Sequence, residues 1–111
     1  MNCTIPQTLL EKVRRAMRLE ETEFEEYVES LEAEALAYIG SLLYTDVDKI
    51  DDEIKKIMIG FYLQYALYSK LEKDEISQDK LDFLNSYITG FNDKTERVNK
   101  TNGTQRGVKF I

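Results

Sequence analysis

The 111-residue sequence predicts an all-α protein, a small four-helix bundle with a polar, basic, extended or hairpin-like C-terminal tail. Three observations predict this fold. Apolar residues recur at spacings of three and four in four successive segments, as on the buried face of a helix. The chain has a single Pro, and 42% of its residues are hydrophobic, which suffices for one modest core. We expect residues 1–92 to form the helical domain and residues 93–111 a flexible tail.

The first two helices differ in how clearly their starts are marked. The first, Gln7–Arg18, could begin at Pro6, which suits the first helical position, or at a capping box formed by Thr8 and Glu11. The second begins at a capping box, Thr22–Glu25. Its apolar stripe covers about 20 residues, or about 30 Å of helix, and consists of Phe24, Val28, Leu31, Ala35, Tyr38 and Leu42.

The third helix begins near Asp51, where acidic residues suit the positive end of the helix dipole. From Ile57 to Tyr68 the sequence is apolar on almost every side of the helix. Such a helix either lies at the centre of a core or shares a face with a neighbouring subunit. Both interpretations remain open, and the candidate subunit-interface residues are Ile57, Met58, Phe61, Tyr62, Tyr65 and Tyr68.

The fourth helix is predicted from Gln78 to about Phe91, with Ser77 as its cap. Gly90 and Asn92 are expected to end it. Its buried stripe follows spacings of three, four and three residues and consists of Leu81, Leu84, Ile88 and Phe91.

The segment after the fourth helix loses the helical period. Asn102-Gly103 suits a tight turn between two strands, Arg97–Thr101 and Thr104–Phe110, so a β-hairpin is one interpretation. The favoured one is a tail that is mobile when free and extended on a partner, because an isolated hairpin is marginal in water. The candidate partner-binding residues of the tail are Arg97, Lys100, Arg106, Val108, Lys109, Phe110 and Ile111.

The net charge of -6 is unevenly distributed along the chain. Up to Asn92 there are 19 acidic and 10 basic side chains, a formal charge of -9, and the remaining residues carry +3. Eight Glu residues between Glu20 and Glu34 follow one another without a Lys or Arg between them. The basic group just before them is Lys12, Arg14, Arg15 and Arg18.

The composition excludes most catalytic chemistry. The chain has no His, no Trp and one Cys, so it lacks His-based triads, His or Cys metal clusters and an internal disulfide. We expect no enzymatic activity, no cofactor and no metal. Cys3 is expected to be a reduced thiol in a cytosolic protein. The longest apolar stretch, Ile57–Tyr68, is shorter than the about 20 residues of a membrane span, so no membrane contact is expected.

The order of segments resembles the small head–tail connector (adaptor, head-completion) proteins of tailed bacteriophages and prophages. The resemblance covers about Thr8–Phe91. A short first helix ends in Val13-Arg14-Arg15-Ala16-Met17-Arg18-Leu19-Glu20, and an acidic second helix closes with Ala35-Leu36-Ala37-Tyr38-Ile39-Gly40. An Asp-rich loop and the apolar helix Ile54–Tyr68 follow. The short polar last segment departs from the pattern of many relatives.

The resemblance implies a non-enzymatic ring subunit that docks to the portal protein and prolongs the DNA exit channel. Its partners would be further copies of itself, the portal and the next head-completion or tail protein, while DNA passes through without specific binding. Such a protein would occupy the host cytoplasm during assembly and then the head–tail interface of the virion. The tail would attach the ring to the portal by strand addition. The candidate channel-lining acidic face is Glu23, Glu25, Glu26, Glu29 and Glu32, which would repel DNA.

Two other classes compete with this one. The apolar third helix also suits a homodimeric adaptor, a small helical interaction or regulatory module with a two-fold interface. A nucleic-acid binder would use Arg14, Arg15, Arg18 and the basic tail, but the acidic average disfavours it. The Glu-rich run is also typical of an ordinary solvated helix face.

Overall fold

The computed structural model describes the backbone of residues 5–103 and the side chains of residues 5–94. It contains helices α1 (Gln7–Met17), α2 (Glu21–Leu42), α3 (Asp52–Lys70) and α4 (Asp74–Gly103), and a short 3-10 helix η1 (Val47–Lys49). There is no strand in this part of the chain. The all-α fold with four helices is therefore confirmed.

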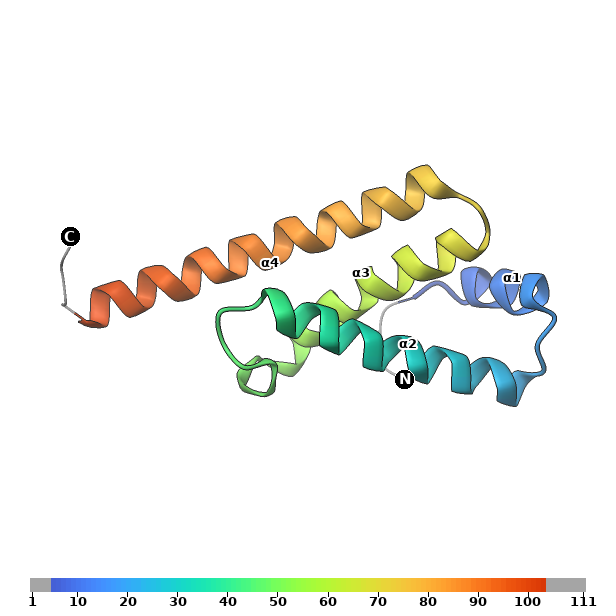
Figure 1. The fold of residues 1–111 in the computed structure, drawn as a ribbon, viewed down its shortest axis with the longest axis horizontal. Coiled ribbons are helices and arrows are strands. Elements are labelled where there is room, and N and C mark those ends of the chain that lie inside the picture. Colours follow the sequence, from blue (N-terminus) through green and yellow to red (C-terminus); the bar gives the residue numbers. More distant parts are fainter. Residues whose placement is uncertain (1–4, 104–111) are drawn as a thin grey trace.

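Helix α3 is the centre of the fold. It packs against α4 along an antiparallel pair, and also against α2 and α1, whereas contact between the other α-helices is slight (Figure 1). Met58, Leu63 and Leu67 of α3 are completely buried. Because three helices cover it, α3 needs apolar residues on most of its sides, which explains much of the pattern that also suggested a shared interface.

The core is completed by one buried stripe from each other helix. Leu9 and Val13 come from α1, and Leu84 and Ile88 come from α4. The predicted stripe of α2 is confirmed over its first four members, but Tyr38 is only half-buried and Leu42 is 39% exposed. Ile39 is fully buried in their place. Tyr38 follows Phe24 by two sets of seven residues, over which a strict alternation of four and three drifts by about 40° around a straight helix, so the buried position has moved by one residue to Ile39. Leu42 is the last residue of α2.

The starts of α1 and α2 differ from the predicted capping boxes. The residue before α1 is Pro6, and no side chain caps this helix. The capping box of α2 lies two residues earlier than predicted, with Glu20 as the cap and Glu23 as its partner. The backbone N–H of Glu20 donates to Oε1 of Glu23 at 3.0 Å. The predicted start of α3 is confirmed, since Asp51 Oδ1 accepts a hydrogen bond from the N–H of Glu53.

Helix α4 is longer than predicted at both ends. It begins at Asp74, so Ser77 is not its cap; the Ser77 hydroxyl is buried and donates to the Tyr65 carbonyl oxygen at 2.8 Å. It continues to Gly103, so the predicted end near Phe91 and the predicted strand at 97–101 are wrong. The boundary at 92/93 that we expected between domain and tail falls inside this helix, and residues 104–111 lie outside the described residues.

Asn92 explains why α4 does not end where expected. Asn usually ends helices because its side chain competes for its own backbone groups. Here the Asn92 side chain is buried and bonds to the end of α2 instead. Its Nδ2 donates to the Leu42 carbonyl oxygen at 2.9 Å, and its Oδ1 accepts from the Tyr44 N–H at 3.1 Å. Tertiary contact thus removes the local competition, and α4 extends past the other helices (Figure 1).

Two turns between helices depend on a left-handed residue that is not Gly. Arg18 after α1 has φ 58°, and Glu72 after α3 has φ 59°. In the turn at Arg18, the N–H of Leu19 donates a hydrogen bond to the Arg14 carbonyl oxygen at 3.2 Å. In the turn at Glu72, the N–H of Lys73 donates to the Tyr68 carbonyl oxygen at 3.0 Å. Both turns therefore satisfy helix C-terminal carbonyls at the cost of an unfavourable backbone conformation.

Candidate functional site

An exposed apolar surface lies where α3 and α4 pack together. Ile57 is 45% exposed and Phe83 is 54% exposed. The half-buried Phe61 ring lies between α4 neighbours, with its centroid 6.1 Å from that of Phe83 and 6.3 Å from that of Tyr87. We call Ile57, Phe61, Phe83 and Tyr87 the α3–α4 face. Clustered exposed apolar groups of this kind are typical of interaction sites.

The six predicted interface residues do not form one surface. Ile57 and Phe61 belong to the α3–α4 face. Met58 is completely buried inside the chain, so its prediction as an interface residue is wrong. Tyr62 and Tyr65 lie on the side of α3 that faces α2, and Tyr68 is half-buried. The sequence did contain a missed signal for the rest of the face, because Phe83 and Tyr87 follow one another at a spacing of four.

A cluster of tyrosines joins α2 to α3 on the other side. The Tyr62 ring centroid lies 5.3 Å from that of Tyr38 and 5.5 Å from that of Tyr65. The Tyr62 hydroxyl donates to Glu34 Oε1 at 3.3 Å, and the Tyr38 hydroxyl donates to Asn85 Oδ1 at 2.7 Å. Burial, and then the nearby Glu34 carboxylate, raise the pKa of Tyr62. The three tyrosines pack against one another, and the hydroxyls of Tyr38 and Tyr62 serve as hydrogen-bond donors.

A groove separates α1 from α2. Helix α1 packs mainly against α3, so α1 and α2 diverge from the short turn that connects them. The space between them is about 410 Å³. Its apolar floor consists of Ile5, Leu10, Phe24 and Val28, and its acidic rim consists of Glu11, Glu21, Glu25, Glu29 and Glu32. We call this the α1–α2 groove.

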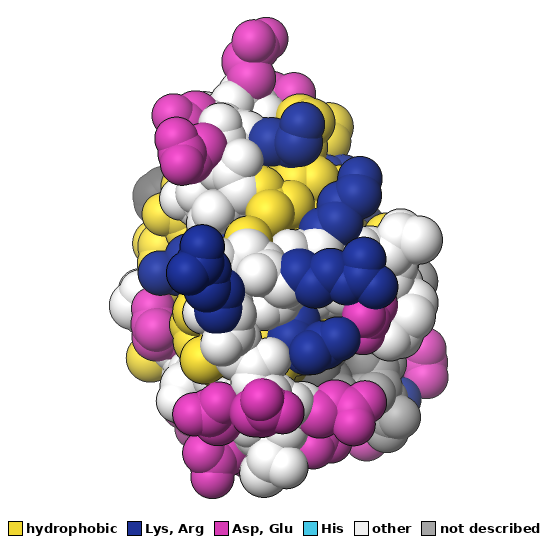
Figure 2. All heavy atoms as spheres, turned by 90° about the vertical axis from the view of Figure 1, so that its right-hand side faces the viewer, with side chains coloured by type: hydrophobic (Ala, Val, Ile, Leu, Met, Phe, Trp, Pro, Cys, Tyr) yellow, Lys and Arg dark blue, Asp and Glu magenta, His cyan; other side chains and the backbone are white. Residues whose placement is uncertain are grey.

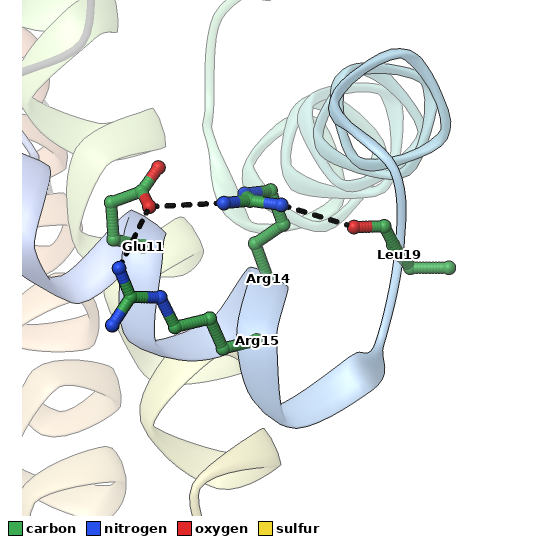
Figure 3. Close-up of polar contacts among 4 residues, drawn as sticks. All are labelled: Glu11, Arg14, Arg15 and Leu19. Atoms are coloured by element: carbon green, nitrogen blue, oxygen red, sulfur yellow. Dashed lines mark hydrogen bonds and ion pairs between the residues drawn. The ribbon is translucent and has the colours of Figure 1, made fainter.

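Arg14 is the basic side chain that lines the α1–α2 groove. Its Nη2 lies 3.1 Å from Glu11 Oε2, and its Nη1 donates to the Leu19 carbonyl oxygen at 3.3 Å (Figure 3). Arg15 lies 3.9 Å from the same Glu11 carboxylate and is far more exposed. The hydrogen bond from Arg14 lowers the pKa of Glu11. Arg14 therefore fastens the α1–α2 turn and neutralises one carboxylate of the rim.

The five Glu residues predicted to line a channel do not share one face of α2. Glu25, Glu29 and Glu32 line the α1–α2 groove. Glu23 closes the capping box, and Glu26 is exposed outside the groove. Contact between these residues and a channel stays a prediction for the assembled protein.

Charge is segregated at the end of the molecule that carries α1. Lys and Arg side chains gather across the middle of this end, and Asp and Glu side chains gather below them, over the start of α2 (Figure 2). The basic residues of α1 and its turn are Lys12, Arg14, Arg15 and Arg18. One chain therefore presents surfaces of opposite charge side by side.

The predicted tail residues are mostly outside the described part of the chain. The backbone at Arg97 and Lys100 lies within α4, and their side chains are not described. Arg106, Val108, Lys109, Phe110 and Ile111 lie outside the described residues, as does Cys3. Their proposed contact with a portal stays a prediction.

The described residues contain no group of three or more His, Cys, Asp or Glu side chains that could hold a metal ion. None of the helices in residues 5–103 is long and apolar enough to cross a membrane. Comparison of the chain with protein-family models, curated proteins and solved structures finds no match.

Proposed function

We propose that this protein is a non-enzymatic structural subunit of a homo-oligomeric ring, and that the ring is a phage head–tail connector that docks to a portal protein and prolongs the DNA exit channel. The observation that carries the oligomer is the α3–α4 face. Phe83 is 54% exposed and packs against Phe61 of the neighbouring helix, so aromatic surface remains open to water in the single chain. Burying it against a second copy is favourable by about 25 cal/mol per Å².

The charge distribution supports contact between copies. In a two-fold contact residue i of one copy meets residue j of the other and the reverse, so the acidic start of α2 in each copy can face the basic residues of α1 in the other. In a head-to-tail contact, the basic residues of α1 in one copy can face the acidic rim in the next. Head-to-tail contacts close into rings when the rotation between copies permits it.

The connector role rests on the resemblance in segment order and on the acidic surface. Within the described residues, the exposed carboxylates of α2 greatly outnumber its cations, since Glu21–Leu42 contains no Lys or Arg. Such a surface repels DNA phosphates and lets DNA pass without adhering. The competing homodimeric adaptor uses the same α3–α4 face with a single partner.

The oligomer is tested by sedimentation velocity and negative-stain electron microscopy of the full chain. The wild type is expected to form assemblies of more than two copies, alone or after mixing with a portal protein encoded beside it. Phe83→Glu is expected to give monomers. Tyr44→Glu is the matched control, because the Tyr44 side chain is 70% exposed in the loop after α2 and lies outside the α3–α4 face.

The outcomes separate the two functions. Rings bound to portal particles support the connector. A dimer that no portal enlarges supports the adaptor and overturns the connector. A wild type that stays monomeric at millimolar concentration, with and without portal, overturns the oligomer itself.

A further inference from the structure

The α1–α2 groove has the chemistry of a peptide-binding site. Its floor offers Leu10, Phe24 and Val28 side chains, while four carboxylates of α2, Glu21, Glu25, Glu29 and Glu32, stand along its rim. Of the described side chains, Arg14 brings the one positive charge to its lining. A segment that alternates apolar and basic side chains would place the apolar ones on the floor and the basic ones beside the rim.

The chain itself contains such a segment. Residues 104–111 read Thr-Gln-Arg-Gly-Val-Lys-Phe-Ile, and in an extended chain Lys109 projects to the opposite side from Val108 and Phe110. Arg106, two residues before Val108, adds a second positive charge on the side of Val108 and Phe110. This segment has two basic and no acidic side chains, so its charge is opposite to that of the groove. Its apolar side chains, Val108, Phe110 and Ile111, can pack against the apolar floor of the groove.

The segment cannot enter the groove of its own chain. The C-terminal end of α4 and helix α1 lie at opposite ends of the long axis of the molecule, which measures 57 Å (Figure 1). Eight residues span at most about 28 Å when fully extended. The occupant must therefore come from a second copy.

We propose that residues 104–111 of one copy bind in the α1–α2 groove of the next copy. This inference deepens the proposed function and rests on it, because it supplies a head-to-tail contact in which the two interacting surfaces are different. Repeated around an assembly, such a contact generates a ring or an open chain of subunits. It assigns the segment to a neighbouring copy, in place of the portal contact expected from the resemblance.

The direct test is fluorescence anisotropy with a labelled peptide of residues 104–111. The receptor is the full-length chain carrying Val108→Glu and Phe110→Glu, so that its own segments do not compete. We expect saturable binding that weakens as salt is added, since part of the attraction is between exposed charges. Glu29→Lys in the receptor is expected to weaken binding by at least about tenfold, because one attraction becomes a repulsion.

Glu26→Lys is the matched control. It makes the same change of charge on the same helix, but Glu26 lies outside the groove. We expect it to weaken binding by less than about twofold at physiological salt, where distant exposed charges are screened. A Lys109→Glu peptide is expected to bind the Glu29→Lys receptor better than it binds the unaltered groove.

Other results overturn the inference. The inference is wrong if the peptide shows no saturable binding. It is also wrong if Glu26→Lys and Glu29→Lys weaken the affinity for the peptide equally, because only net charge would then attract the peptide. Binding that survives Glu29→Lys but is lost with Phe83→Glu would place the segment on the α3–α4 face. If this inference fails while wild-type rings persist and Phe83→Glu disperses them, the proposed function stands. If the peptide binds as expected but no portal binds the protein, the groove site stands and the connector fails.

Discussion

Replacing Asn92 by Ala tests how the end of α2 is fastened to α4. The Asn92 side chain is 6% exposed and satisfies two backbone groups at once. Its amide donates to the Leu42 carbonyl oxygen, one of the last carbonyls of α2, and its carbonyl accepts from the Tyr44 N–H just beyond that helix. Ala leaves both groups without these partners.

The expected loss follows from these two bonds. Each hydrogen bond contributes about 0.5–1.5 kcal/mol net, and a group left unsatisfied costs about 1–3 kcal/mol when water cannot replace the partner. Leu42 and Tyr44 have exposed side chains, so we expect water to reach part of this site. Ala is also a better helix former than Asn by about 0.6 kcal/mol. We therefore expect Asn92→Ala to lower the free energy of unfolding by about 1–2 kcal/mol, or Tm by about 4–15 °C.

Urea denaturation followed by far-UV circular dichroism measures this loss. Ser86→Ala, an exposed change in the same helix, is the control and is expected to leave stability unchanged or slightly higher. Asn92→Asp is expected to cost more than Asn92→Ala, because a carboxylate oxygen would then face the Leu42 carbonyl oxygen. An Asn92→Ala protein as stable as the wild type would refute the reasoning.

Three further predictions concern the turns, the core and the ion pair. Arg18→Gly should raise the free energy of unfolding in urea by about 0.5–1 kcal/mol, because Gly adopts the left-handed conformation without strain, whereas Ser86→Gly inside α4 should lower it by a similar amount. Leu63→Ala should lower it by about 2–5 kcal/mol, since the side chain is completely buried, and an unchanged thermal midpoint would contradict that placement. Arg14→Gln should raise the pKa of Glu11, as an NMR titration would record. Because the folded-state pKa of Glu11 is lowered, the stabilisation by Arg14 is present above the unfolded pKa and is lost as the pH falls through the folded value; a stability difference that grows on acidification would contradict this.

The number of α-helices could be predicted from local pattern, whereas the short helix η1 was not. The stripe from Phe24 to Ala35 and the start of α3 at Asp51 are confirmed, because each depends on residues within one or two turns of the helix. The extent of α4 could not be predicted. Asn92 is a local helix terminator, and only its contact with α2, some 50 residues away in sequence, reverses that preference.

The interaction surfaces were predicted less well than the helices. The neighbours Ile57 and Met58 are equally apolar, yet one is 45% exposed and the other is completely buried. Sequence cannot separate them until the positions of α2 and α4 around α3 are known. The Glu-rich run lies on α2, as predicted. Some of its carboxylates lie beside apolar side chains because α1 and α2 enclose a groove, and local sequence pattern does not encode the relative position of these two helices.

The attachment of α1 mainly to α3 has a consequence for the motions of the protein. Leu9 and Val13 are the α1 side chains that are buried, and each contributes at most about 3 kcal/mol. We therefore expect helix α1 to detach while α2, α3 and α4 remain folded, and its amide hydrogens to exchange with solvent faster than those of α3. Since α1 forms one wall of the α1–α2 groove, a ligand can bind in the groove only when α1 is packed against α3. Its binding should slow exchange in α1 by a factor that grows with ligand concentration, and should leave the slowest amides of α3 less affected.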